Sequence, residues 1–225
     1  MVATAASPLQ QVSLRDQALA FLRQSIVAGD IVPGEIYSAS SFASQLGVSN
    51  SPVREAMLTL VNEGLMETVR NRGFRVVPLS DKDRANIYEL RLDLEVPSMG
   101  RLAASGRVAG HEARFTELAA GIVAAESRED MVAYLEYDRQ FHLGLIELLD
   151  NSQLAAIVAN LRDQTRLYGL RSLSERGLLA ASAAEHQPIL DAVVAGDRPL
   201  AERLTCEHLQ HIQGDWAGRP PREAD

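Results

Sequence analysis

The sequence feature that most constrains the fold is a change of pattern at residues 78–81, where Pro-Leu-Ser-Asp interrupts the chain. Before this point, segments with helical spacing of apolar residues are followed by two short runs typical of strands. After it, apolar residues recur almost entirely at helical intervals, and no run is typical of a strand. We therefore expect a mainly α protein in which a small mixed domain precedes an all-α helical bundle.

The charge of the chain changes at the same point. Residues 1–80 contain six Arg and six acidic residues, whereas residues 81–225 contain 16 basic and 24 acidic residues and carry the whole net charge of −8. This step supports a division into two domains. The acidic second part would be repelled by a nucleic acid, so only the first part could bind one.

Length and composition are those of an ordinary globular protein, with 225 residues of which 46% are hydrophobic and 23% charged. No apolar run approaches the roughly 20 residues that cross a bilayer, and the first residues have neither the basic nor the apolar region of a signal peptide. We expect a cytoplasmic protein without a membrane partner. The single cysteine, Cys206, excludes an internal disulfide and a zinc site built on paired cysteines.

The first domain is predicted to contain three helices. The first extends from Ser13 to Gly29 and opens with the S-x-x-D spacing of an N-terminal cap. Helices over 40–46 and 49–62 follow, separated by a short turn that contains glycine. Pro52 is tolerated in the first turn of the last helix, where backbone amides have no intrahelical partner. The last two segments form a helix-turn-helix candidate, a geometry that also occurs in proteins that do not touch DNA.

A β-hairpin is predicted directly after these helices. Strand-like runs over 65–70 and 74–79 are separated by Asn71-Arg72-Gly73, whose Asn and Gly suit the positive φ angles of a hairpin turn. A hairpin in this position is a wing. It would carry Arg70, Arg72 and Arg75 on one projection.

Arg54 lies in the first turn of the predicted recognition helix. Such a helix can enter the major groove with its N-terminus leading, where its amides and Arg54 would face phosphates and base edges. The arginines of the wing would reach the DNA backbone or the minor groove. The domain is neutral overall, but its basic groups would share one face.

Four motifs in this domain resemble the DNA-binding domain of the GntR family of bacterial transcriptional regulators. They are residues 26–34 (IVAGDIVPG), 46–57 (LGVSNSPVREAM), 60–65 (LVNEGL) and 71–76 (NRGFRV). The resemblance implies operator contacts by Ser49, Asn50, Ser51 and Arg54, and a wing tip formed by Arg72 and Gly73. Asn50 stands where the family commonly has a basic residue, and an Asn amide can pair with adenine, so a changed base preference is implied.

The second domain is predicted to be a bundle of about six helices. Their predicted ranges are 81–105, 111–126, 128–149, 152–172, 178–195 and 198–213. The resulting domain plan is a flexible tail over 1–12, a winged helix-turn-helix domain over 13–78, a linker over 79–84, the bundle over 85–213 and a flexible tail over 214–225.

One carboxylate and three imidazoles are predicted to converge inside this bundle. Asp138 and His142 are four residues apart and project from one helical face. His186 and His208 lie 10 and 12 residues from Gly196, so an antiparallel hairpin would bring them to nearly the same height. His211, one turn after His208, is a rival ligand. A D-x-x-x-H pair can also be a simple hydrogen bond, so spacing alone leaves a metal site open.

A second set of motifs resembles the FCD ligand-binding domain of the FadR subfamily within the same family. They are residues 88–95 (YELRLDLE), 138–143 (DRQFHL), 149–152 (LDNS), 185–197 (EHQPILDAVVAGD) and 207–209 (EHL). The resemblance implies a divalent ion, zinc, nickel or manganese, bound by Asp138, His142, His186 and His208. It also implies that Arg91 meets the carboxylate of a small effector.

The sequence therefore predicts a homodimeric regulator, most often a repressor in such families, that binds a pseudo-palindromic double-stranded operator and responds to a small carboxylate. A regulator with a metal-free apolar pocket remains an alternative. A metal-dependent hydrolase or oxygenase with an accessory winged helix is another, but the sequence shows no placed general base, no nucleophile beside a base and no cofactor loop.

Overall fold

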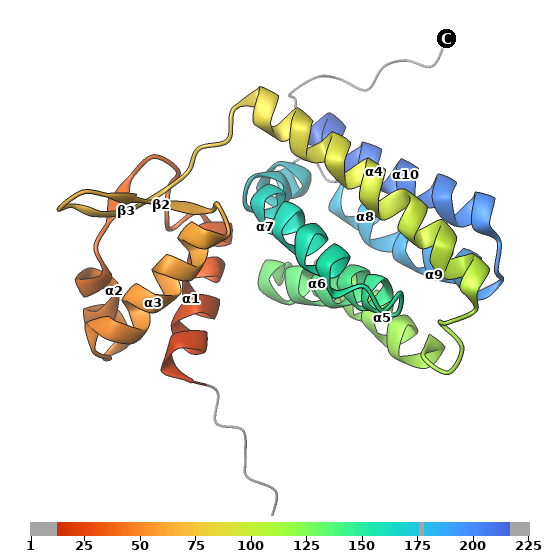
Figure 1. Ribbon diagram of the computed structural model, residues 1–225, viewed down its shortest axis with the longest axis horizontal. Coiled ribbons are helices and arrows are strands. Elements are labelled where there is room, and N and C mark those ends of the chain that lie inside the picture. Colours follow the sequence, from red (N-terminus) through yellow and green to blue (C-terminus); the bar gives the residue numbers. More distant parts are fainter. Residues whose placement is uncertain (1–12, 176–177, 217–225) are drawn as a thin grey trace, which may run out of the picture. The chain divides into compact units, whose positions relative to one another are not determined.

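The computed structural model describes residues 13–175 and 178–216, and the chain divides into two units between Val77 and Pro78 (Figure 1). The predicted tail over 1–12 lies outside the described residues. The first unit contains α1 (Leu14–Ala28), β1 (Ile36–Tyr37), α2 (Ala39–Leu46), α3 (Asn50–Asn62), β2 (Met66–Val69) and β3 (Gly73–Val76). The second contains α4 (Asp81–Ser105), α5 (Glu112–Ser127), α6 (Met131–Glu147), α7 (Ser152–Glu175), α8 (Leu179–Ala184), α9 (His186–Val194) and α10 (Arg198–Trp216). This mainly α arrangement confirms the predicted fold class.

The helices of the first unit form as their sequence signals predict. The Ser13 side chain accepts a hydrogen bond from the backbone N–H of Asp16 at the start of α1, and Gly29 ends the helix in a left-handed conformation. α3 packs against both α1 and α2. The fully buried side chains at this junction include Leu22 from α1 and Val53, Met57 and Leu60 from α3. Their burial fixes α3 by its inner face, so its outer face remains in contact with solvent.

The wing is a three-stranded antiparallel sheet in the order β1-β3-β2. The hairpin was predicted, and the turn has positive φ at Asn71 (58°) and Gly73 (129°). The strands are shorter than the predicted runs because the pairing of β2 with β3 extends only from Met66 opposite Val76 to Val69 opposite Gly73. β1 was not predicted, since two residues are too short to show an alternating pattern.

The second unit is built from helices that pack in neighbouring pairs, principally α4 against α10 and α5 against α6 (Figure 1). One predicted boundary was wrong: the single helix expected over 178–195 is divided into α8 and α9 at Glu185. Pro188 explains the division, because it lacks the N–H that a continuous helix would donate to the carbonyl of Ala184. α10 extends to Trp216, beyond the predicted end at residue 213, so the predicted tail over 214–225 was wrong at its first three residues. Its residues 217–225 lie outside the described residues.

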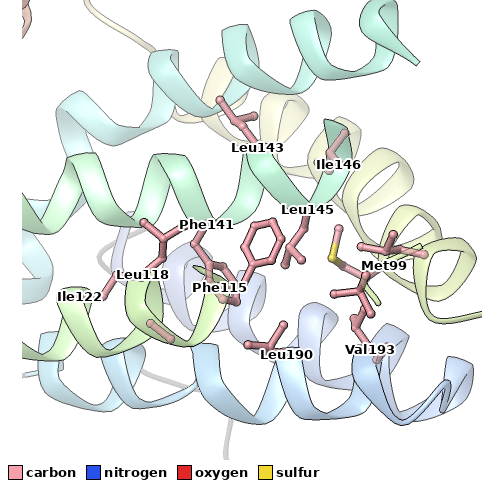
Figure 2. Close-up of a cluster of buried hydrophobic side chains, with 14 of the residues drawn as sticks. Met99, Phe115, Leu118, Ile122, Phe141, Leu143, Leu145, Ile146, Leu190 and Val193 are labelled. Carbon is pink, nitrogen blue, oxygen red and sulfur yellow. The ribbon is translucent and has the colours of Figure 1, made fainter. Parts of the chain in front are cut away.

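The hydrophobic core of the second unit borders the polar residues of interest. The Phe115 and Phe141 rings meet edge to face, with centroids 6.1 Å apart (Figure 2). Phe141 also contacts the rings of His142 and His186, with centroids 5.3 and 5.1 Å away. The aromatic core therefore forms one wall of the site described below. Among the described residues, no helix combines the length and the apolar character needed to cross a bilayer.

Gly73 provides a test of the wing. A Cβ at this position would overlap the carbonyl oxygen of Tyr37 on β1, and the φ of 129° is strained for any other residue. We expect Gly73→Ala to destabilise the first unit by at least about 1–3 kcal/mol, measured by denaturant unfolding and by hydrogen exchange of the hairpin amides.

Gly47→Ala is the matched control. Gly47 also has a positive φ, 66°, but a Cβ there meets nothing within 4 Å. The free energy of unfolding of the control should fall only by the cost of an alanine in the left-handed conformation, about 1–2 kcal/mol. Its hairpin amides should keep their protection from hydrogen exchange. Equal losses of stability and protection in the two variants would contradict this account of the wing.

Candidate functional site

The N-terminus of α3 is exposed and carries four of the predicted DNA-contacting residues, Ser49, Asn50, Ser51 and Arg54. Ser49 makes no side-chain capping hydrogen bond, unlike Ser13 before α1 and Ser38 before α2. The first-turn amides of α3 are therefore not capped by Ser49. Together with the positive end of the helix dipole, such amides suit a phosphate.

The wing lies beside this helix within the first unit. The guanidinium carbon of Arg54 lies 5.9 Å from the centre of the Phe74 ring on β3, which connects α3 to the hairpin. Arg70 and Arg72 are exposed at the hairpin turn, next to Gly73. Arg75 differs from expectation, because its guanidinium pairs with Glu67 on the neighbouring strand at 2.6 Å. The available positive charge of the wing is therefore at the turn.

In the second unit, the structure brings together the four predicted ligand residues, Asp138, His142, His186 and His208. They come from α6, α9 and α10, and all four are buried. One ligand atom from each lies within 4.8 Å of the other three. That span is roughly twice a metal–ligand distance of about 2.0–2.2 Å, so small side-chain shifts would place all four atoms around one ion.

Two of the imidazoles are oriented by outer hydrogen bonds. The Nδ1–H of His186 donates to the carbonyl oxygen of Ala183 at 3.1 Å, and the Nδ1–H of His208 donates to the carboxylate of Glu185 at 2.7 Å. In the neutral imidazole, each Nε2 then carries a lone pair. His208 Nε2 is buried and has no hydrogen-bond partner among the described residues.

The inner atoms of His142, His186 and Asp138 lie close to one another. His186 Nε2 lies 3.2 Å from Asp138 Oδ1 and 3.1 Å from His142 Nε2. Burial lowers the pKa of His142 well below its ordinary value, and it also lowers the pKa of His208. Neutral imidazoles and a carboxylate form a suitable donor set for a divalent cation. The residues present therefore fit a metal ion.

A buried charge network that sequence reasoning missed adjoins this cluster. Arg162 on α7 donates from Nη2 to Asp138 Oδ2 at 3.1 Å and from Nη1 to the Glu95 carboxylate on α4. Arg162 and Glu95 are 2% and 1% exposed. A signal for Arg162 was available, because it follows Leu154 and Val158 at helical spacing on the buried face of α7.

Arg91, the predicted effector contact, belongs to the same network. Its Nε donates to Glu95 at 2.6 Å, and its Nη1 donates to the Thr165 hydroxyl at 3.3 Å. Burial lowers the pKa of Arg91, while the Glu95 carboxylate opposes that shift. Arg91 is therefore inside the bundle, with two of its donors already used by protein groups.

The chain has two further histidines, His111 and His211. His111 is exposed and precedes α5. The side chain of His211, the rival ligand, lies outside the described residues.

Comparison with known proteins supports both halves of the prediction. Residues 14–76 match the family model described as bacterial regulatory proteins, gntR family, and residues 86–211 match that of the FCD domain. An uncharacterised HTH-type transcriptional regulator from an unstable DNA locus of Streptomyces ambofaciens is 30% identical over 200 residues, which cover 86% of this chain and 81% of the relative.

Two further proteins match this chain over a similar share of their length. The gluconate operon transcriptional repressor of Bacillus subtilis is 31% identical over 199 residues, covering 85% of this chain and 80% of the relative. The solved structure of Escherichia coli McbR/YncC superposes with a TM-score of 0.76 and 25% identity, covering 89% of this chain and 95% of that one. The chain therefore belongs to the GntR family, has an FCD domain after its winged helix-turn-helix domain, and is a DNA-binding transcriptional regulator and not an enzyme.

Proposed function

We propose that the chain represses transcription by binding a pseudo-palindromic operator through α3 and the wing. The observation that carries this proposal is the exposed surface formed by the uncapped N-terminus of α3, Arg54 and the hairpin arginines, in a domain that matches the gntR family model. Ser49, Asn50 and Ser51 would meet bases or phosphates in the major groove, and Arg72 with Gly73 would meet the adjacent backbone or minor groove.

Repression is supported by the names of relatives. Besides the gluconate repressor, a probable D-xylose utilization operon transcriptional repressor of Paenarthrobacter nicotinovorans is 30% identical over 207 residues. Gluconate carries a carboxylate and xylose does not, so the names of these relatives do not identify the chemical class of the effector. We propose a homodimer acting in the cytoplasm, because a two-fold operator is matched by two copies of the DNA-binding domain.

The second part of the proposal concerns the signal. Asp138, His142, His186 and His208 would hold one divalent cation, and the cation would supply open coordination positions for an oxygen of a small carboxylate effector. The buried polar donors argue against the alternative of an apolar, metal-free pocket at this place.

The buried charge network offers a route from this site to the DNA-binding unit. Asp138 contacts Arg162, and Arg162 contacts Glu95 on α4. α4 is the helix that follows the first unit directly in sequence. A ligand that favours one packing of α4 would shift the equilibrium between DNA-binding and non-binding arrangements of the dimer.

Arg54→Ala should weaken operator binding by about 1–3 kcal/mol if Arg54 contacts a base. If Arg54 contacts a phosphate instead, the slope of log affinity against log salt concentration should become smaller in magnitude by about one. The measurement is a fluorescence anisotropy titration at several salt concentrations, with a duplex selected from random DNA by the wild-type protein. Arg203→Ala is the control, because Arg203 is an exposed arginine of α10 in the second unit that pairs with Glu207. Unchanged affinity and salt slope in Arg54→Ala would contradict the proposed DNA surface.

His186→Ala should weaken zinc binding by at least about 100-fold, because removing even an outer partner of a ligand costs 10–100-fold. Zinc should raise the unfolding temperature of the wild type by mass action and fail to do so in the variant. Metal content and calorimetric zinc titration provide the measurement. His111→Ala, which removes an exposed imidazole, should bind zinc as the wild type does. If both variants bound zinc equally well, the proposed cation site would be wrong.

A further inference from the structure

Arg54 differs from half of the arginines in its own unit in the group that holds its side chain. Three of the six arginines of the first unit pair with carboxylates: Arg15 with Asp16, Arg23 with Glu63 and Arg75 with Glu67. Arg54 is exposed and is the one basic residue of α3. Within the described residues, its guanidinium contacts the Phe74 ring, with the guanidinium carbon 5.9 Å from the ring centre. An aromatic ring therefore takes the place that a carboxylate has beside the other three.

The nature of this contact decides how much charge Arg54 presents to a partner. A carboxylate that pairs with an arginine offsets the positive charge, so the pair attracts a polyanion only weakly. The face of an aromatic ring attracts a guanidinium through the ring quadrupole and carries no net charge. Arg54 is therefore held in place and keeps its full charge. This combination suits a side chain that contacts DNA, because a carboxylate partner would compete with the phosphates.

Phe74 is fixed more firmly than the arginine that it contacts. It lies on β3, the central strand of the sheet, opposite Tyr37 on β1 and Thr68 on β2. Its side chain is 3% exposed, so packing restricts the movement of the ring. The ring belongs to the wing and the guanidinium to α3. The contact therefore sets the position of the Arg54 charge relative to both elements of the proposed DNA surface.

Holding the Arg54 side chain in advance lowers the cost of binding DNA. A free arginine side chain has many rotamers, and ordering them at an interface weakens binding. We propose that Phe74 is a positioning residue for DNA recognition. Its ring holds the Arg54 guanidinium beside the wing in the free protein and in the complex, and this contact strengthens operator binding. The inference rests on the proposed DNA surface of α3 and the wing.

The test changes the charge distribution of the ring and leaves its size almost unaltered. Phe74→Leu would remove the ring but would also leave a cavity in the wing. Phe74 is instead replaced by trifluorophenylalanine, in which fluorine withdraws electrons from the ring face. Operator affinity of the full-length protein is measured by fluorescence anisotropy, with the duplex that the wild type selects from random DNA. We expect a loss of about two- to fivefold, the range of a cation–π contact at an exposed site.

Two controls separate positioning from a structural effect. Phe42 is also buried in the first unit, and its ring contacts the rings of Phe21 and Tyr37. Trifluorophenylalanine in place of Phe42 should leave operator affinity unchanged. In the second control, Phe74 is fluorinated in the Arg54→Ala variant. The fluorine atoms should then have no effect on affinity, because the guanidinium that the ring holds is absent.

The number of fluorine atoms gives a further readout that a purely structural role would not move. One, two and three ring fluorines at Phe74 should lower operator affinity progressively, since each weakens the attraction for a cation. Denaturant unfolding checks that each variant is folded. If the trifluoro variant does not fold, the variant with one fluorine should still show a smaller loss of the same sign, and unchanged affinity in it would contradict the proposal.

An equal loss on fluorination of Phe74 with and without Arg54 would overturn the inference, because Phe74 would then act on the wing and not on the arginine. Unchanged or higher affinity of the fluorinated protein that keeps Arg54 would overturn it as well. In both cases a loss of affinity in Arg54→Ala alone would leave the proposed DNA surface intact. Unchanged affinity in Arg54→Ala would instead refute that surface.

Discussion

The convergence of one carboxylate and three buried imidazoles in the second unit is the constraint on which the proposed function depends. The Ala183 carbonyl and the Glu185 carboxylate accept hydrogen bonds from Nδ1–H of His186 and His208, so Nε2 of both rings faces inward. Asp138 Oδ1 adds a negative oxygen 3.2 Å from one of them. His208 Nε2 is buried without a hydrogen-bond partner among the described residues, which is costly, and a divalent cation would bind it together with the other three ligand atoms.

The same constraint gives the surrounding network a role. Arg162 holds the outer oxygen of Asp138 and connects it to Glu95, while Arg91 holds Glu95 and Thr165. Removing one member of such a network leaves a buried charge unpaired, so its members act as a unit. The network joins α6, α7 and α4. We infer that occupancy of the cation site is transmitted to α4 by these contacts.

Much of this arrangement could be predicted from the sequence, because caps, glycines and apolar spacing are local signals. The hairpin turn at Asn71–Gly73, the start of α1 at Ser13 and the convergence of the four ligand residues were all accessible in that way. The spacing of Arg162 after Leu154 and Val158 indicated its burial, but its partners are 24 and 67 residues away in sequence, and long-range ion pairs leave no local pattern. Arg75 was assigned to the basic surface because its cross-strand pairing with Glu67 depends on strand register.

The proposed function requires that a single divalent cation occupies the cluster of Asp138 and three imidazoles. The most direct test is anomalous X-ray diffraction from crystals of the full-length protein prepared with zinc, recorded at the zinc absorption edge. We expect one strong peak about 2.0–2.2 Å from Asp138 Oδ1 and from Nε2 of His142, His186 and His208. Zinc located only elsewhere, with the three imidazoles hydrogen-bonded to one another or to water, would contradict it.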